Sequence, residues 1–79
     1  MFKRRIGKDP HADGKETANL AGCPDIWELT DGRFAIIGLD MTERLRSQLP
    51  STASCGVDER IIVLDRRILV DAKPDIPAE

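Results

Sequence analysis

Apolar and polar residues alternate most clearly over residues 23–40, CPDIWELTDGRFAIIGLD, and this pattern predicts a β-hairpin. The runs DIWEL and RFAIIG flank Asp31-Gly32, a dipeptide that is preferred at the centre of two-residue hairpin turns. A two-residue turn at this point places Trp27 opposite Ile36, and it therefore fixes which side chains share a face of the hairpin.

The two faces of the predicted hairpin differ in composition. One face holds large apolar side chains, which we expect to form the core: Trp27, Leu29, Phe34 and Ile36. The opposite face is mixed: Ile26, Glu28, Ala35 and Ile37. If another element covers the mixed face, the hairpin is a scaffold; if not, that face is the best candidate surface for a partner. A role for Trp27 in stacking on a ligand is the alternative to its role in the core.

A short helix is expected directly after the hairpin, over about residues 41–49. Its apolar side chains recur at every fourth position: Met41, Leu45 and Leu49. Pro50 ends the helix, because proline cannot continue its hydrogen-bond ladder. Asp40 and Glu43 have the spacing of a capping box, which makes Asp40 the N-cap; Thr42 as the N-cap is the alternative.

The C-terminal part of the chain predicts a third strand and a second short helix. The run RIIVLD, about residues 60–65, is typical of a strand covered on both faces, and we expect it beside the hairpin. Residues 66–72 fit a helix capped by Asp65, with Ile68, Leu69 and Ala72 on one face; continuation as a strand is the alternative. The fold class is therefore α+β, a small ββαβ(α) domain in which a three-stranded sheet packs on one or two helices.

The first part of the chain predicts a disordered basic tail over residues 1–22, because glycine, proline and aspartate are scattered there without an apolar period. The folded domain is then expected over residues 23–77. With 79 residues in all, such a domain buries a small core. Pairing with a second copy or with a partner protein is therefore expected to supplement it.

Charge is spread unevenly along the chain, whose formal net charge is -2. The tail carries five Lys/Arg against three Asp/Glu, whereas the rest carries seven against eleven. An acidic domain is unsuited to broad contact with nucleic-acid phosphates. No apolar run approaches the roughly 20 residues that span a bilayer, and no signal peptide is evident, so a cytoplasmic protein without membrane contact is expected.

Residue types that usually carry catalysis or bind metals are scarce. The single histidine, His11, lies in the tail, and the two cysteines, Cys23 and Cys55, do not form a CxxC motif. The cysteines are compatible with two reduced thiols or with a disulfide, and both possibilities stay open. We expect no enzymatic activity, no metal and no cofactor.

Six residues are candidates for binding a partner. The densest basic group of the domain is Arg60, Arg66 and Arg67, and the last two begin the predicted second helix, whose free amides favour anions. The others belong to the mixed hairpin face: Ile26, Glu28 and Ile37. Solvated charges without a partner are the alternative for the three arginines.

The segments GCPDIWELTDGRFAIIGLDMT and CGVDERIIVLDRRILVDAKPDIP resemble a group of short, uncharacterised actinobacterial proteins. These proteins share a Cys-Pro-Asp-Ile-Trp-Glu opening, an Ile-Gly-x-Asp step and a Pro-Asp-Ile-Pro ending, and the resemblance covers about residues 22–77. Members of the group are encoded near helix-turn-helix regulators, which implies a regulatory accessory role. The resemblance supplies no catalytic or binding residue.

The sequence therefore favours a non-enzymatic protein-interaction or regulatory accessory module, whose partner is a regulator or a second copy. The alternative is a small nucleic-acid-binding regulator, monomeric or dimeric. It would use the basic residues of the tail and of the second helix: Lys3, Arg4, Arg5, Arg66 and Arg67. A weaker resemblance of RIIVLDRRILVDA to swapped-hairpin DNA-binding domains points the same way, but the acidic domain opposes it.

Overall fold

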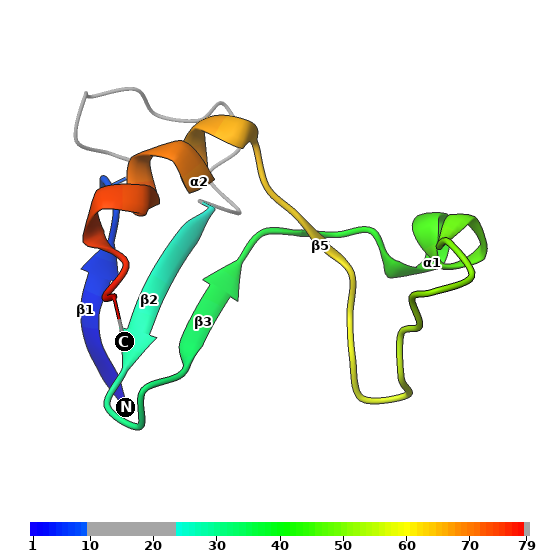
Figure 1. Cartoon of the computed structure of the whole chain (residues 1–79), viewed down its shortest axis with the longest axis horizontal. Helices are drawn as coiled ribbons and strands as arrows, with labels where there is room; N and C mark the ends of the chain where they lie inside the picture. Colours follow the sequence, from blue (N-terminus) through cyan, green and yellow to red (C-terminus); the bar gives the residue numbers. More distant parts are fainter. Residues whose placement is uncertain (10–23, 79) are drawn as a thin grey trace.

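The computed structural model describes residues 1–9 and 24–78, and its architecture is α+β, as the sequence predicts (Figure 1). Its strands are β1 (Phe2–Ile6), β2 (Asp25–Leu29), β3 (Phe34–Ile37), β4 (Leu39–Asp40) and β5 (Ile62–Val63). Its helices are α1 (Thr42–Leu45) and α2 (Arg66–Ala72), which the single 3₁₀ turns η1 (Arg46–Gln48) and η2 (Lys73–Asp75) extend. One antiparallel sheet has the order β1-β2-β3, and a separate antiparallel ribbon joins β4 to β5.

Strand β1 lies where the sequence predicts a disordered tail, so that prediction is wrong for residues 2–6. The charges that make FKRRI look like a tail have partners across the ladder: Arg4 lies opposite Glu28, and Arg5 lies close to Asp25. Ile6 is only 2% exposed and belongs to the core. Residues 10–22 of the predicted tail, and Cys23 at the start of the predicted domain, lie outside the described residues.

The hairpin forms at the predicted place, but its register differs by one residue from the prediction. Trp27 lies opposite Ala35, not Ile36, because the loop contains three residues rather than two. The Leu29 amide donates to the Arg33 carbonyl at 2.8 Å, which closes this longer loop. Within this loop only Gly32 has a positive φ, of 90°, whereas a two-residue type I′ turn needs positive φ at both central residues.

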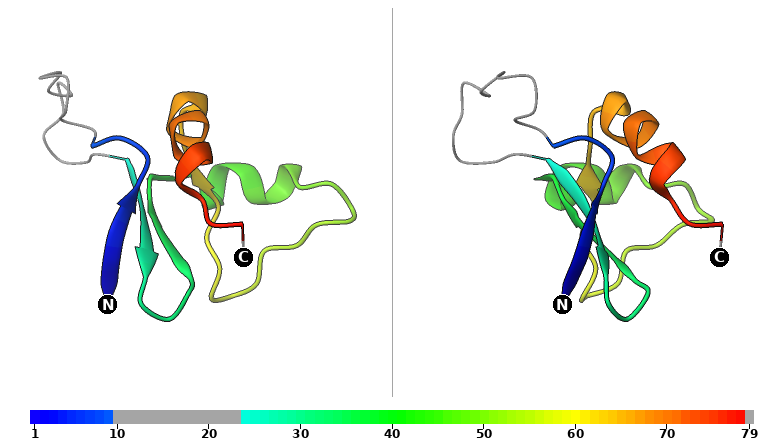
Figure 2. Two further views of the ribbon diagram at one scale, coloured as in Figure 1. Left: turned by 60° about the vertical axis from the view of Figure 1, so that its left-hand side comes forward. Right: turned by 90° about the vertical axis from the view of Figure 1, so that its left-hand side faces the viewer.

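The one-residue difference exchanges the faces of β3, and the predicted division into core and mixed faces is wrong. The buried apolar residues are Ile6, Ile26 and Ala72, with Leu64 and Ile68 packed against them. Ile26 thus belongs to the core, although the sequence assigned it to the mixed face. Figure 2 shows α2 on one face of the sheet, which is the face that carries Ile26. Trp27 lies on the opposite face and is half-buried.

Helix α2 confirms the helical interpretation of residues 66–72. Asp65 occupies the N-cap position but makes no side-chain capping bond, and Leu69 is largely exposed, so only part of the predicted face packs on the sheet. The helix crosses the end of β1 closely at Gly7, whose φ is 85°. A Cβ atom at Gly7 would lie 3.2 Å from the Ala72 nitrogen, so the glycine permits this crossing.

Strand β5 occupies the predicted segment but joins β4 instead of the main sheet. Residues 39–63, which run from β4 through α1 to β5, form an extension that we call the arm. In Figure 1 the arm leaves the sheet at the end of β3 and returns toward α2. Both residues of β5 are more than a third exposed, which contradicts the prediction of a strand covered on both faces.

The helix of the arm covers most of the predicted range, and η1 ends two residues before Pro50. Its start differs from both predicted caps, because Met41 occupies the N-cap position and Thr42 is the first helical residue. The Asp40 carboxylate instead accepts from the Thr42 amide and hydroxyl, at 3.0 and 2.6 Å. Glu43 does not complete a capping box, since its carboxylate points to Arg60, at 3.6 Å.

Candidate protein-interaction surface

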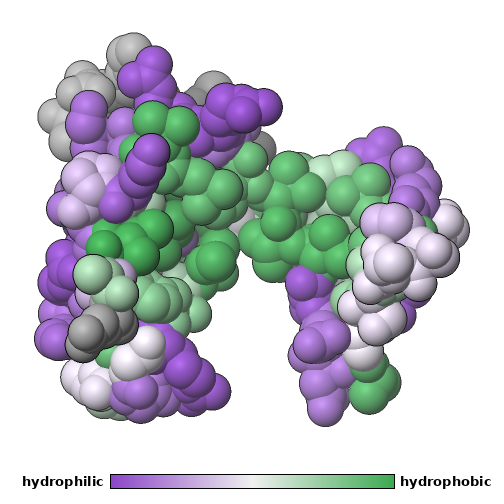
Figure 3. All heavy atoms as spheres, viewed as in Figure 1, coloured by the Kyte–Doolittle hydropathy of each residue, from purple (hydrophilic) through white to green (hydrophobic). Residues whose placement is uncertain are grey.

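Exposed apolar side chains continue from the edge strand of the main sheet onto both faces of the β4–β5 ribbon, and we call this set the apolar strip. It consists of side chains from three strands: Phe34 and Ile36 of β3, Leu39 of β4, and Ile62 and Val63 of β5. These side chains are between 37% and 64% exposed. Figure 3 shows apolar groups spread across the middle of the molecule, from the sheet to the arm, with a hollow below them. Clustered exposed apolar groups of this kind mark contact surfaces in soluble proteins.

The backbone of β3 adds unpaired polar groups to this strip. Strand β3 is at the end of the sheet, with β2 as its one neighbour among the described strands. Leu29 and Arg33 are opposite each other and are joined by a backbone hydrogen bond. In an antiparallel ladder, opposite residues that exchange backbone hydrogen bonds alternate with opposite residues that do not. The N–H and C=O groups of Phe34 and Ile36 therefore point away from β2, toward the free edge.

The opposite edge of the sheet is protected from such contacts by charge. Strand β1 carries Lys3, Arg4 and Arg5 in its centre, whereas β3 carries no charged residue. Lysine and arginine on an edge strand discourage pairing with another chain, and an uncharged apolar edge does not. The two edges of this sheet thus differ in their capacity to accept a partner strand.

The structure changes the status of the three candidates on the predicted mixed face. Ile26 and Glu28 are buried, so both are removed from any contact surface. Glu28 lies on the covered face of β2, where it accepts from Arg4 Nε at 2.8 Å. Ile37 is half exposed, but it lies on the face opposite to Ile26 because of the shifted register. The one-residue slip explains the change at Ile37, whereas Ile26 is buried by α2 and Glu28 is paired with Arg4 of β1.

Arg60 is bound within the arm rather than presented to a partner. Its Nε donates to Asp40 Oδ2 at 3.0 Å, and the same carboxylate accepts from Thr42. These hydrogen bonds, first those from Thr42 and then that from Arg60, lower the pKa of Asp40 to about 2. The Thr42 hydroxyl also accepts from the Ile61 amide at 2.7 Å. The cluster fastens the start of α1 to the segment that leads into β5.

Arg66 and Arg67 are exposed in the first turn of α2 and make no side-chain ion pair with any described residue. The structure does not join them with Arg60 into one basic group, since Arg60 is held by the acids of the arm. Three of the cations proposed for nucleic-acid binding are also ion-paired, and Lys3 Nζ lies 4.0 Å from Glu28 Oε2. Arg4 binds Glu28, and Arg5 binds Asp25 at 3.1 Å.

Trp27 takes part in a polar and aromatic cluster on the outer face of the sheet. Its Nε1 donates to Asp25 Oδ2 at 2.8 Å, and the guanidinium of Arg5 lies 4.6 Å from the centre of its ring. The ring also meets Phe2 edge-on, at 5.7 Å between centroids. These contacts tie β1 to β2 and occupy the ring, so the structure gives Trp27 a structural role.

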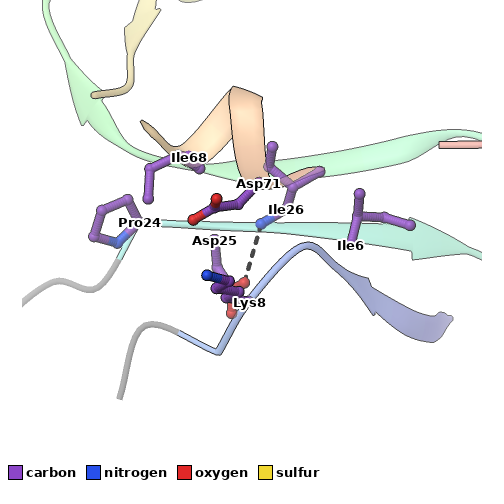
Figure 4. A pocket seen from close by; sticks show the side chains of 7 residues that line it. All are labelled: Ile6, Lys8, Pro24, Asp25, Ile26, Ile68 and Asp71. Atoms are coloured by element: carbon purple, nitrogen blue, oxygen red, sulfur yellow. Dashed lines mark hydrogen bonds between the residues drawn. The ribbon is translucent and has the colours of Figure 1, made fainter. Parts of the chain in front are cut away.

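A small cavity lies between the end of β1, β2 and α2 (Figure 4). Its volume is about 20 Å³, and its lining includes Ile6, Asp25 and Asp71. A space of this size holds about one water molecule. The Asp25 carboxylate beside it already accepts from the Ile26 amide at 3.1 Å. The cavity is therefore too small for an organic ligand.

An open depression of about 410 Å³ lies on the arm, where Leu49, Cys55 and Glu59 are among its lining residues. The Cys55 thiol is free and donates to the Glu59 carbonyl at 3.2 Å. In the described parts of the chain, no three histidine, cysteine or acidic side chains are grouped to hold a metal ion.

Comparison of the chain with protein-family models, with curated proteins and with solved structures finds no match. The resemblance to the short actinobacterial proteins thus stays a prediction. Within residues 1–9 and 24–78, no helix has the length and apolar character that crossing a membrane requires.

Proposed function

We propose that this protein is a non-enzymatic protein-interaction module that serves as an accessory to a regulator, with the apolar strip as its contact surface. The observation that carries the proposal is the imbalance between buried and exposed apolar residues. In the described parts, Ile6, Ile26 and Ala72 are the buried apolar residues, whereas twelve large apolar residues are exposed. Such exposure is expected of a surface that a partner covers.

The position of the strip supports the same proposal. Its side chains lie where the sheet meets the arm, and hydrogen bonds around Asp40 join the two ends of the arm to each other. A surface formed on ordered elements requires little rearrangement when a partner binds, which lowers the entropic cost of association. The regulatory part of the proposal rests on the resemblance to proteins encoded near helix-turn-helix regulators.

The contact surface is tested by exchanging one apolar side chain of the strip for a charge. Leu39 is 64% exposed, so Leu39→Glu leaves the core intact. Val57→Glu is the matched control, because Val57 is 93% exposed and lies in the loop of the arm, outside the strip. Each variant is co-expressed with the products of the adjacent genes, and the mass of the purified complex is measured by light scattering.

We expect the wild-type chain and Val57→Glu to form a complex with a regulator, and Leu39→Glu to bind at least tenfold more weakly. A complex that forms equally well with Leu39→Glu would remove the strip as the contact surface. A double substitution, Arg66→Glu with Arg67→Glu, tests the basic start of α2 in the same assay. Loss of binding only in that variant would move the contact surface to α2.

A further inference from the structure

We propose that the free edge of β3 binds β3 of a second copy, so that two main sheets join into one antiparallel sheet of six strands. The inference deepens the proposed function and rests on it, since it names the occupant of the β3 part of the apolar strip. Leu39, Ile62 and Val63 remain available for a different protein. The two copies would be related by a two-fold axis through the middle of β3.

The unpaired backbone groups of β3 select one register for this contact. Full pairing requires that residues with outward N–H and C=O groups meet each other, and in β3 these residues are Phe34 and Ile36. Phe34 of each copy then lies opposite Ile36 of the other copy. All the outward groups of both residues are used in this register. Registers displaced by two residues in either direction leave some of them without a partner.

The side chains are compatible with the same register. Phe34 and Ile36 lie on the face that α2 covers elsewhere, and each is 42% to 49% exposed in the single chain. Cross-strand pairing of an aromatic with a β-branched side chain would reduce this exposure and stabilise the contact. Ala35 meets its own equivalent on the other face, where its small side chain permits close approach. Arg33 lies opposite Ile37, so no like charges face each other.

The composition and exposure of β3 favour a second copy as the occupant of its edge. The strand FAII carries no charged residue, so two copies meet without repulsion between like charges. Phe34, Ile36 and Ile37 are 42% to 50% exposed in the single chain, so β3 offers apolar surface that a second copy can cover.

Disulfide trapping tests the register directly. In an antiparallel pair that does not exchange hydrogen bonds, the Cα atoms lie about 4.5 Å apart, which is within the range that a disulfide spans. The variant Ala35→Cys is prepared in a background with Cys23→Ser and Cys55→Ser. Ile37→Cys in the same background is the matched control, because the two copies of residue 37 would lie roughly 13 Å apart along the strands.

We expect mild oxidation to convert most of the Ala35→Cys protein into a covalent dimer and to leave Ile37→Cys uncrosslinked. The chain without new cysteines is expected to have twice the mass of 8.8 kDa in light scattering at about 100 µM. A monomeric mass together with no Ala35→Cys crosslink would overturn the proposal. Equal crosslinking of both variants would overturn the register and, with it, the six-stranded sheet.

A second variant blocks the contact without breaking the hairpin. Proline at position 36 removes an N–H group that points away from β2, and proline is tolerated on an edge strand in that orientation. Ile36→Pro is expected to be a folded monomer by light scattering and circular dichroism, and a folded dimer would contradict the proposal.

Binding of a regulator, measured with Leu39→Glu as above, tests the proposed function separately. If the chain forms a dimer but binds no regulator, the proposed function is refuted and the dimer is not. If the chain is a monomer that binds a regulator, the dimer is refuted and the proposed function is not.

Discussion

Replacement of Ile6 by alanine tests whether β1 belongs to the core. Ile6 is 2% exposed and packs with Ile26 and Ala72, so its side chain is almost fully removed from water. Truncation of a buried isoleucine to alanine costs about 2–5 kcal/mol. A domain of this length has a free energy of unfolding of roughly 4–12 kcal/mol. We therefore expect Ile6→Ala to lose a large fraction of the stability, and Ile6→Val to lose about 0.5–1.5 kcal/mol.

Urea unfolding followed by the fluorescence of Trp27 is the suitable assay. Trp27 contacts Arg5 and Phe2 of β1, so its emission reports on the docking of this strand. All variants are compared at one protein concentration, because self-association couples stability to concentration. Val57→Ala is the control, expected to change the free energy of unfolding by less than about 0.5 kcal/mol. An Ile6→Ala variant as stable as this control would refute the placement of β1 in the core.

Three further predictions concern the arm and α2. Because the pKa of Asp40 is lowered to about 2, its stabilising hydrogen bonds are present above pH 4 and are lost as the pH falls through 2. Asp40→Asn should therefore lower the urea midpoint more at pH 6 than at pH 2, where Asp40 is half protonated; equal differences at both pH values would contradict the assignment. Gly38→Ala should displace β5, since a Cβ atom there would lie 2.7 Å from Ile62 Cγ2, and unchanged amide chemical shifts in β5 would count against this. Arg66→Glu with Arg67→Glu should leave the urea midpoint unchanged within error, because neither side chain has an ion-pair partner among the described residues, and a large loss of stability would show a missed contact.

Local signals in the sequence were sufficient to place the hairpin and both helices. The dipeptide Asp31-Gly32 marks the turn, and Pro50 and Asp65 mark helix boundaries, because each acts on the backbone within a few residues. The register was not predictable in the same way. Asp-Gly fits a two-residue loop and also the end of a three-residue loop, and the choice between them decides the face of every β3 side chain.

The contributions of β1 and of the apolar strip depend on contacts between distant residues. The charges of FKRRI indicate a tail when they are considered alone, and they become part of a strand only when Glu28 and Asp25 lie opposite them. A two-residue turn places Phe34 and Ile36 in the core, so the sequence does not identify them as candidate contact residues. Their unpaired backbone groups become evident only from the strand order, which leaves β3 at an edge.

Amide hydrogen exchange along β3, measured as a function of protein concentration, tests the central claim most directly. The amides of Ala35 and Ile37 face β2, so their exchange should be slow at every concentration. The amides of Phe34 and Ile36 should exchange rapidly in dilute samples and become protected as the concentration rises and the second copy covers the edge. Rapid exchange of Phe34 and Ile36 at the highest concentration, with Ala35 and Ile37 still protected, would contradict the claim that β3 is a contact edge.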